Sequence, residues 1–484
     1  MIIVAITGPT RQEALSQIAR SRRYAALFEL RLDILHEEDV RPFIKKAGKP
    51  VVATCRPTWE GGGFTGSEPS RLALLADAVR TGASYIDLEM QLGEATIRQF
   101  VRQNRRARVI ASRHYFDGTL PDPAREYQAL RSTGAHVLKL AYRAGDVSDI
   151  QGVIAFLKKA KSQRQKAVAI AMGEAGEPSR ILYRKLGGWA TYAAPVGGPP
   201  AADGQIPADV LHSLFRADAL SGQTRIFGVI GNPVRYSKGI HLHNPLFQQA
   251  GKNAVYCRFE VHDLARFMEN IMPHLQGLSV TLPHKIAIMD YLDEIEERAR
   301  SIGAVNTVIR RGRKLIGDNT DGSGALDAIE EKLRVKGKSF LVLGAGGAAR
   351  AIAAEAQRRG ALVFVTNRTM TRAEEVASAT GAKATTVEKG SSYDIVANAT
   401  SVGMAPEVDG TPLPAGFVRM RLAFDAVYQP AESRFLREAK EQGAITVSGV
   451  EMYLNQAAAQ SRMYTGIKPD IRGMRRLMTH VFPV

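Results

Sequence analysis

The sequence predicts an α/β protein in which an N-terminal (β/α)8 barrel precedes a smaller α/β domain and a dinucleotide-binding domain. At 484 residues, the chain is too long for one ordinary domain. Its first half repeats a short apolar run and a helical pattern eight times, which is the count of a closed barrel. After residue 336, an apolar run, a glycine-rich turn and an Ala-rich helix follow one another in the order of a dinucleotide-binding unit.

The composition argues against several classes of protein. The formal net charge is +17, but the basic residues are scattered, which favours pockets for anionic small molecules over nucleic-acid binding. No apolar run is long enough to span a membrane, and the first residues, MIIVAITGPT, are typical of a strand and not of a signal peptide. The two cysteines, Cys55 and Cys257, lie far apart in the sequence, so we expect a reducing cytoplasm and no metal site. Whether the chain is a monomer or a homodimer stays open.

Eight apolar runs in the first half are expected to form the barrel strands. They are Ile2–Ile6, Ala26–Leu30, Val51–Thr54, Tyr85–Leu88, Val109–Ala111, Val137–Leu140, Ala167–Ala171 and Ala190–Ala193. Helical patterns such as Arg71–Arg80 and Asp149–Lys161 lie between them. A last helical segment, Ala208–Ala219, leads to a short polar joint at Ser221–Thr224. In this fold the chemistry is found where the strands end.

Polar side chains gather at these strand ends or open the helices that follow. They are Glu29, Arg31, Asp33, Arg56, Asp87, Glu89, His114, Lys139, Arg180 (expected to open the seventh helix) and Gln205. A lysine inside an apolar strand loses solvation, which favours the free amine that attacks a carbonyl. A histidine opposite could then move a proton next to the iminium carbon. Each residue alone also has a structural interpretation: Lys139 could lie outside the barrel wall, and His114 could be a hydrogen-bonded structural histidine.

The motifs ELRLD, SRH-x-F and GQI, together with the isolated Lys139, resemble type I 3-dehydroquinate dehydratase over about 210 residues. The resemblance implies that Lys139 forms a Schiff base, that His114 is the general acid and base, and that Glu29 assists His114. It also implies four residues that bind the substrate, namely Arg31, Arg56, Arg180 and Gln205. Two positions depart from the family: Ala201-Ala202-Asp203 replaces Ser-Ala-Pro, and Tyr115 follows the histidine where Asp is common.

The second half continues the α/β alternation and offers a proton donor for carbonyl reduction. Strands are expected at Ile226–Ile230, Val255–Phe259, Gly277–Val280 and Ala304–Ile309. Lys285 and Asp321 lie on the loops that follow, where an aspartate could orient a lysine that protonates the carbonyl oxygen. The alternative is that both are surface residues of a helix start and an Asx turn.

The dinucleotide unit is predicted to bind NADP and not NAD. Gly344, Gly346 and Gly347 follow the strand Phe340–Leu343, and the helix Ala348–Ala356 would turn its N-terminus toward a pyrophosphate. The next strand, Ala361–Thr366, ends without the acidic residue that binds a free ribose hydroxyl. It is followed by Asn367, Arg368, Thr369 and Arg372. Arginines in these positions suit a 2′-phosphate.

This half resembles shikimate dehydrogenase throughout. The matching motifs, in order, are GNPVRYSK, VTLPHK, GAVNTV, NTDG, GAGGAARA, NRT, NATSVGM, FDAVYQP and GVEMYLNQA. The resemblance implies that Lys285 and Asp321 are the catalytic pair. It implies shikimate contacts from Ser237, Thr281, Asn306, Asp321 and Gln456, with Tyr428 nearby. It implies NADP contacts from Gly344, Gly346, Gly347, Ala348, Asn367, Arg368, Thr369 and Arg372.

Together the two halves predict consecutive steps of aromatic amino-acid biosynthesis. The expected domains are 1–222 for the dehydratase barrel, 223–335 with 449–484 for the substrate domain, and 336–448 for the NADP domain. One departure bears on substrate choice, because Gly239 and Ile240 replace the second Ser and the Pro of the family's Ser-x-Ser-Pro. The lost hydroxyl favours a reductase altered toward quinate or dehydroquinate, unless His241 or Tyr236 supplies a compensating contact. A regulatory protein that senses a quinate-type ligand is the alternative from a different class.

Overall fold

The computed structural model describes residues 1–37 and 39–479. The chain divides into two compact units. The first comprises Met1–Ile226, Asn232–Arg235 and Asn253–His274; the second comprises Phe227–Gly231, Tyr236–Lys252 and the chain from Leu275 onward. None of the helices in the described residues is both long and apolar enough to cross a membrane.

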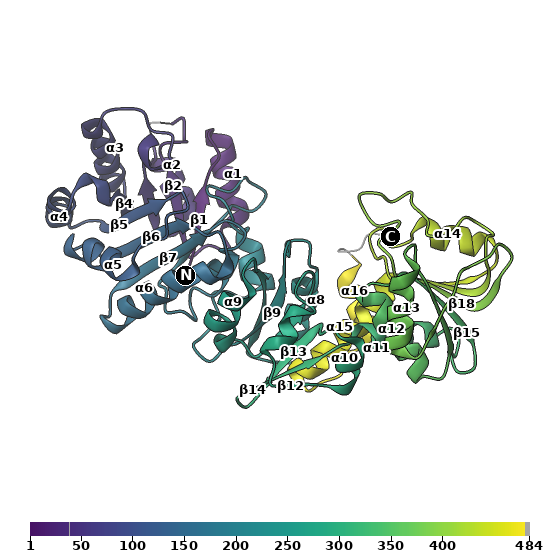
Figure 1. Ribbon diagram of the computed structural model, residues 1–484. Helices are drawn as coiled ribbons and strands as arrows, with labels where there is room; N and C mark the ends of the chain where they lie inside the picture. The colour runs from purple at the N-terminus through teal and green to yellow at the C-terminus, as the bar shows by residue number, and fades with distance from the viewer. Residues whose placement is uncertain (38, 480–484) are drawn as a thin grey trace. The chain divides into compact units, whose positions relative to one another are not determined.

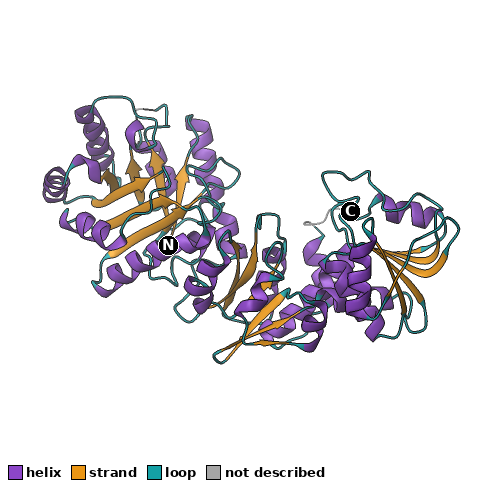
Figure 2. Cartoon of the chain, viewed as in Figure 1, coloured by secondary structure: helices purple, strands orange, loops and turns teal. Residues whose placement is uncertain are grey.

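The first unit is the predicted barrel, with eight parallel strands inside a layer of helices (Figures 1 and 2). The strand order is β7-β6-β5-β4-β3-β2-β1-β8, and the backbone N–H of Trp189, just before β8, donates to the carbonyl of Ala167 on β7 at 2.8 Å. The strands are β1 Ile2–Ile6, β2 Leu27–Arg31, β3 Val51–Thr54, β4 Tyr85–Glu89, β5 Arg108–Tyr115, β6 Val137–Arg143, β7 Lys166–Met172 and β8 Thr191–Ala193. The helices are α1 Arg11–Ser21, α2 Arg41–Ala47, α3 Glu68–Arg80, α4 Glu94–Gln103, α5 Pro123–Ser132, α6 Ile150–Ser162 and α7 Glu177–Ile181.

The register of the barrel strands brings distant polar residues to one level. Glu89 on β4 pairs with Ser112 on β5, and Ser112 pairs with Lys139 on β6. All three side chains are buried, although the strands around them are almost entirely apolar. The parallel register therefore builds a polar layer inside the barrel from residues that are far apart in the sequence.

A second sheet of six strands has the order β10-β9-β11-β13-β14-β12. Its strands are β9 Arg225–Gly231, β10 Ala254–Glu260, β11 Gly277–Val280, β12 Glu294–Ile295, β13 Thr307–Arg311 and β14 Lys314–Asp318. The helices of this part are α8 Gly239–Gln249, α9 Leu264–Asn270, α10 Glu297–Ile302 and α11 Asp321–Glu330. The carboxyl ends of the neighbouring parallel strands β9 and β11 meet at one edge, which brings the loops after Gly231 and after Val280 together.

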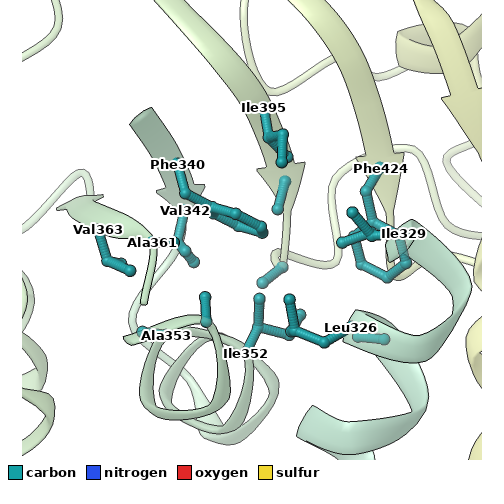
Figure 3. Close-up of a cluster of buried hydrophobic side chains, with 14 of the residues drawn as sticks. Leu326, Ile329, Phe340, Val342, Ile352, Ala353, Ala361, Val363, Ile395 and Phe424 are labelled. Atoms are coloured by element: carbon teal, nitrogen blue, oxygen red, sulfur yellow. The ribbon is translucent and has the colours of Figure 1, made fainter. Parts of the chain in front are cut away.

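The third sheet is parallel, with the order β17-β16-β15-β18-β19-β20 of a dinucleotide-binding domain. Its strands are β15 Ser339–Leu343, β16 Leu362–Thr366, β17 Lys383–Ala384, β18 Ser392–Asn398, β19 Arg419–Asp425 and β20 Ile445–Val447. Its helices, and those that complete the chain, are α12 Gly347–Arg358, α13 Met370–Thr380, α14 Arg434–Glu441, α15 Gly449–Thr465 and α16 Ile471–Met478. Figure 3 shows the core, where strand residues such as Phe340 and Ile395 pack against Ile352 of α12 and Ile329 of α11.

The structure differs from the predicted elements at three segments. The strand predicted at Ala304–Ile309 begins at Thr307, so Asn306 lies just before it. Arg180 does not open α7 but lies in its last turn. Lys285 lies in a turn, as predicted, and a short 3-10 helix, Ala287–Tyr291, follows it. The helix predicted at Ala208–Ala219 is one π-helical turn, Val210–Leu214, and Arg216, with φ of 49°, takes the left-handed conformation that ends it.

Candidate active sites

A cavity of about 140 Å³ lies inside the barrel. All seven barrel site residues expected from the sequence line it: Glu29, Arg31, Arg56, His114, Lys139, Arg180 and Gln205. Glu60, Phe116 and Tyr192 line it as well. The cavity is therefore walled by cationic side chains with a lysine and a histidine between them, a lining suited to an anionic carbonyl compound.

Lys139 points into the barrel and not out of its wall. Its side chain is buried, and Nζ donates a hydrogen bond to Asp87 Oδ2 at 3.0 Å. Burial alone would raise the pKa of the Asp87 carboxyl, but Arg56 and Lys139 hold that pKa well below its usual range. The amine of Lys139 is thus both buried in the barrel and in contact with an ionised carboxylate.

The carboxylate that contacts His114 is Glu60 and not Glu29. Glu60 Oε1 lies 2.8 Å from His114 Nδ1 and also accepts a hydrogen bond from the His114 backbone N–H at 3.0 Å. Glu29 Oε1 instead accepts from the Thr54 hydroxyl at 2.8 Å. The assistance of His114 by Glu29 stays a prediction, since both residues line the same cavity, whereas the direct contact to His114 comes from Glu60. Glu60 belongs to a short 3-10 helix, Thr58–Glu60, which no apolar pattern marks in the sequence.

Burial shifts the pKa values of His114 and Glu60 in opposite directions. Burial, with Arg56 and Lys139 nearby, holds the pKa of His114 well below its usual value, so the imidazole is neutral. Burial raises the pKa of Glu60 to about 7, an effect that Arg56 opposes. An ionised Glu60 can only accept, so Nδ1 carries the proton and Nε2 is the nitrogen that can take one.

The arginines of the cavity are held by fixed partners. Arg56 is buried, and its guanidinium lies 2.6 Å from Glu89 Oε1 and 3.2 Å from Asp87 Oδ1. Arg31 makes two hydrogen bonds to Asp33, at 2.9 and 2.7 Å. These ion pairs fix the direction of each guanidinium at the cavity wall.

The closing loop after β8 is tied to Arg180 and Gln205. Arg180 donates to the backbone carbonyl of Asp203 at 2.9 Å, and Gln205 Oε1 accepts from the backbone N–H of Ala201 at 2.8 Å. Burial lowers the pKa of Arg180 to about 10. Ala201, Ala202, Asp203 and Gln205 of this loop line the cavity, and Ala201 has no hydroxyl to offer the substrate.

A second polar cluster joins the middle sheet to α15. Lys285 Nζ donates to Asp321 Oδ2 at 2.5 Å, and Asp321 Oδ1 accepts from Asn306 Nδ2 at 2.8 Å. The same amide nitrogen lies 3.3 Å from Gln456 Oε1, and Asn306 Oδ1 accepts from the Thr320 backbone N–H at 2.9 Å. The two residues predicted as a catalytic pair are thus in contact, and a third predicted residue, Asn306, orients the aspartate. The surface alternative does not describe this pair, because Asp321 is buried.

Three further predicted residues lie on loops of the second half. Thr281 follows β11, and its backbone N–H donates to the carbonyl of Ile230 on β9 at 3.0 Å. Ser237 belongs to the loop after β9, where its Oγ lies 3.4 Å from the backbone nitrogen of Gly239. Tyr428 lies in the loop between β19 and α14. The centroid of its ring is 5.8 Å from that of Tyr453 on α15, and burial raises the pKa of Tyr428.

The predicted cofactor residues lie around the N-terminus of α12. Gly344 has φ of 114°, and a Cβ there would lie 3.2 Å from the backbone of Ala399, so only glycine fits this turn. A Cβ at Gly346 or Gly347 would meet nothing within 4 Å, which leaves open space in front of the first helical N–H groups, including that of Ala348.

The end of β16 fits a 2′-phosphate. Asn367 donates to the carbonyl of Thr369 at 3.0 Å, which shapes the loop. Arg368 and Arg372 are both exposed, and neither forms an ion pair within residues 1–37 and 39–479. With no carboxylate at the end of the strand, these residues fit NADP. In the same described residues, no group of three or more His, Cys, Asp or Glu is arranged to hold a metal ion.

Comparisons with known proteins assign the barrel and the second half of the chain to two different enzyme families. The model of type I 3-dehydroquinase matches residues 2–221, that of the shikimate dehydrogenase substrate-binding domain matches residues 229–308, and that of shikimate/quinate 5-dehydrogenase matches residues 327–404. A chloroplastic bifunctional 3-dehydroquinate dehydratase/shikimate dehydrogenase of Arabidopsis thaliana is 37% identical over 92% of this chain and 78% of its own length. A shikimate biosynthesis protein of Chlamydia pneumoniae is 29% identical over 96% of this chain and 95% of its own length.

A solved structure bears on the second half. Shikimate 5-dehydrogenase from Thermus thermophilus, in complex with NADP(H) and shikimate, is 35% identical, covers 53% of this chain and 99% of its own, and gives a TM-score of 0.50. The predicted fold class, a barrel followed by a two-domain dehydrogenase, is confirmed. This chain belongs to the bifunctional 3-dehydroquinate dehydratase/shikimate dehydrogenase family.

Proposed function

We propose that the chain dehydrates 3-dehydroquinate to 3-dehydroshikimate and then reduces that product to shikimate with NADPH. The observation that carries this proposal is the barrel cavity, where buried Lys139 and the His114–Glu60 pair line one space. The Arabidopsis relative is named for both activities, which supports their assignment to one chain. The proposed domains are 1–222, 223–335 with 449–484, and 336–448. Both cysteines are free and buried, which supports the predicted cytoplasmic location.

In the barrel, Lys139 Nζ attacks the ketone carbon, and loss of water gives an iminium that acts as an electron sink. His114 Nε2 removes the proton from the adjacent carbon, because Glu60 holds the opposite nitrogen. The imidazolium then gives a proton to the departing hydroxyl, which leaves as water. Hydrolysis of the iminium releases the product and restores the amine. Arg31, Arg180 and Gln205 bind the polar groups of the substrate around this reacting end.

In the second half, NADPH supplies a hydride to the carbonyl carbon when it is bound. Lys285 donates a proton to the carbonyl oxygen, and Asp321 holds Nζ in place at 2.5 Å. Asn306 fixes the other oxygen of that carboxylate. The proposed shikimate contacts are Ser237, Thr281, Asn306, Gln456 and Tyr428. The N-terminus of α12 would hold the pyrophosphate of NADPH, and Arg368 with Arg372 would hold its 2′-phosphate.

Borohydride trapping tests the barrel assignment directly. Reduction of the full chain in the presence of 3-dehydroquinate should attach the substrate skeleton to the peptide that contains Lys139. Lys139→Met should abolish both the adduct and dehydration, while reduction of added 3-dehydroshikimate continues. Lys166→Met is the matched control, because Lys166 is an exposed lysine at the start of β7, away from the strand ends that form the cavity. Dehydration that persists in Lys139→Met would contradict the proposed role.

Gly239 supports a second candidate, a reductase pocket that also accepts quinate. Gly239 opens α8, and its backbone nitrogen lies 3.4 Å from Ser237 Oγ. Because a hydroxyl that the family places here is missing, we infer that the additional hydroxyl of quinate can be accommodated beside Ser237. Restoring it with Gly239→Ser should lower quinate oxidation at least tenfold relative to shikimate oxidation. Wild-type protein without measurable quinate oxidation would rule this candidate out.

A further inference from the structure

Tyr192 on β8 lies against the reactive amine of the barrel. Its side chain is 3% exposed, and it lines the cavity. Lys139 Nζ lies over the ring face, 4.3 Å from its centroid, which is the geometry of a cation–π interaction. Tyr192 lies on β8, whose neighbour in the sheet is β1, while Lys139 lies on β6. The two side chains therefore meet across the interior of the barrel and not between adjacent strands.

The hydroxyl of Tyr192 is buried without a hydrogen-bond partner among the described residues. Buried hydroxyls are nearly always paired, because an unpaired one loses its hydration without compensation. Burial, with Glu29 and Asp87 nearby, holds the pKa of Tyr192 well above its usual value, so the group is a neutral donor. Phenylalanine would supply the same ring face without this cost, so we expect the hydroxyl to form a hydrogen bond with a bound ligand.

We propose that Tyr192 positions both reactants of the dehydratase: its ring holds Nζ of Lys139, and its hydroxyl binds an oxygen of the bound substrate. The ring face stabilises positive charge on Nζ both as ammonium and as iminium. Because the hydroxyl belongs to the same ring, the oxygen that it binds lies near the carbon that Lys139 attacks. This role rests on the dehydratase reaction proposed above.

Two substitutions separate the two parts of this role. Tyr192→Phe removes only the hydroxyl, and Tyr192→Leu removes the ring as well. Tyr127→Phe is the control, since Tyr127 is equally buried in the barrel unit but bonds Arg131 outside the cavity. Each full-length variant is assayed for dehydration, for borohydride trapping at saturating 3-dehydroquinate, and for reduction of 3-dehydroshikimate, which reports whether the second half is intact. A circular dichroism spectrum compared with that of the wild type reports whether the barrel has folded.

Tyr192→Phe should raise the dehydratase KM about tenfold with little change in kcat, because the hydroxyl contact is present before and during the reaction. Tyr192→Leu should in addition lower kcat about tenfold and reduce the trapped fraction of Lys139. A Tyr192→Phe variant with the kinetics of Tyr127→Phe would overturn the substrate contact, and full trapping in Tyr192→Leu would overturn the role of the ring. If the wild-type chain neither dehydrates nor traps, the dehydratase assignment itself fails, and this role fails with it.

Discussion

The contact between Glu60 and His114 decides which imidazole nitrogen is available to the substrate. Glu60 accepts hydrogen bonds from both the backbone and Nδ1 of His114, so it fixes the ring plane and the tautomer together. His114 stacks on Phe116 with an angle of 7° between the two ring planes, which restricts the imidazole further. The neutral imidazole is therefore presented as a base before the substrate binds.

This contact predicts the acid limb of the dehydratase pH profile. Below a pH of about 7, Glu60 takes up a proton, because burial raises its pKa to that value. It then no longer supplies the charge that supports proton transfer to Nε2, so dehydratase kcat/KM should fall as the pH drops through about 7. His114 does not produce this limb, since its pKa is held well below the usual value.

The variant Glu60→Gln checks the assignment of that limb. We expect dehydratase kcat/KM to fall about a hundredfold, within the range of a general acid–base contribution, and its dependence on pH near 7 to disappear. Thr54→Val, which removes the hydroxyl that binds Glu29, is the control and should keep the limb. A limb near pH 7 that survives in Glu60→Gln would show that another group titrates there.

Single residues could be predicted from the sequence where they lie on a strand or directly after one. Lys139 and Arg56 follow from the rule that chemistry lies at the carboxyl ends of barrel strands. Glu60 could not be assigned as the partner of His114, because it reaches the site from a 3-10 turn between Pro57 and Gly61, where no periodicity directs its side chain. Tyr192 could not be identified for another reason. An aromatic residue in an apolar strand is normally part of the hydrophobic core, and only the contact of its ring with Lys139 indicates a role in the site.

At the scale of elements, the close approach of α11 and α15 builds the reductase site. Asp321 opens α11, while Gln456 projects from α15 toward Asn306. A Cβ at Gly324 would lie 2.7 Å from the backbone nitrogen of Gln456 and 2.8 Å from its Cβ. Glycine at 324 is thus what allows the two helices to place their polar residues together.

Gly324→Ala should therefore damage the reductase and leave the dehydratase intact. The added methyl group forces α15 outward, and overpacking of this kind costs about 1–3 kcal/mol of stability. We expect reductase kcat/KM to fall at least tenfold, with dehydratase kcat/KM unchanged in the same preparation. Glu331→Ala, at the exposed end of α11, is the control. Equal reductase kinetics in Gly324→Ala and wild type would show that the helices do not need this contact.

The elements themselves were largely predictable, since buried parallel strands leave continuous apolar runs. The predicted elements are wrong where tertiary contacts, and not local sequence, determine the backbone conformation. Asn306 was placed inside a strand because its neighbours are apolar, but its side chain bonds Thr320 and Asp321 just before β13 begins. The segment Ala208–Ala219 has helical composition, yet Arg216 adopts a positive φ that no local pattern announces.

At the scale of the whole molecule, the first compact unit extends beyond the barrel to include Asn253–His274. Arg258 on β10 forms an ion pair with Glu177 on α7 at 2.7 Å, and Asp146 accepts from the backbone N–H of His262 at 2.7 Å. Such contacts join residues more than eighty positions apart. The sequence motifs identify the two activities, but they carry no signal for packing of this kind, which depends on the folded surfaces.

The central claim is that one chain carries two consecutive reactions, and one measurement tests it most directly. Purified wild-type protein is given 3-dehydroquinate and NADPH alone, and NADPH oxidation is followed together with identification of the product. We expect NADPH to be consumed and shikimate to accumulate, and Lys139→Met to stop both. Accumulation of 3-dehydroshikimate without NADPH oxidation would contradict an active reductase half, and NADPH oxidation that yields quinate would show that the reductase acts on the first substrate and would contradict the proposed order.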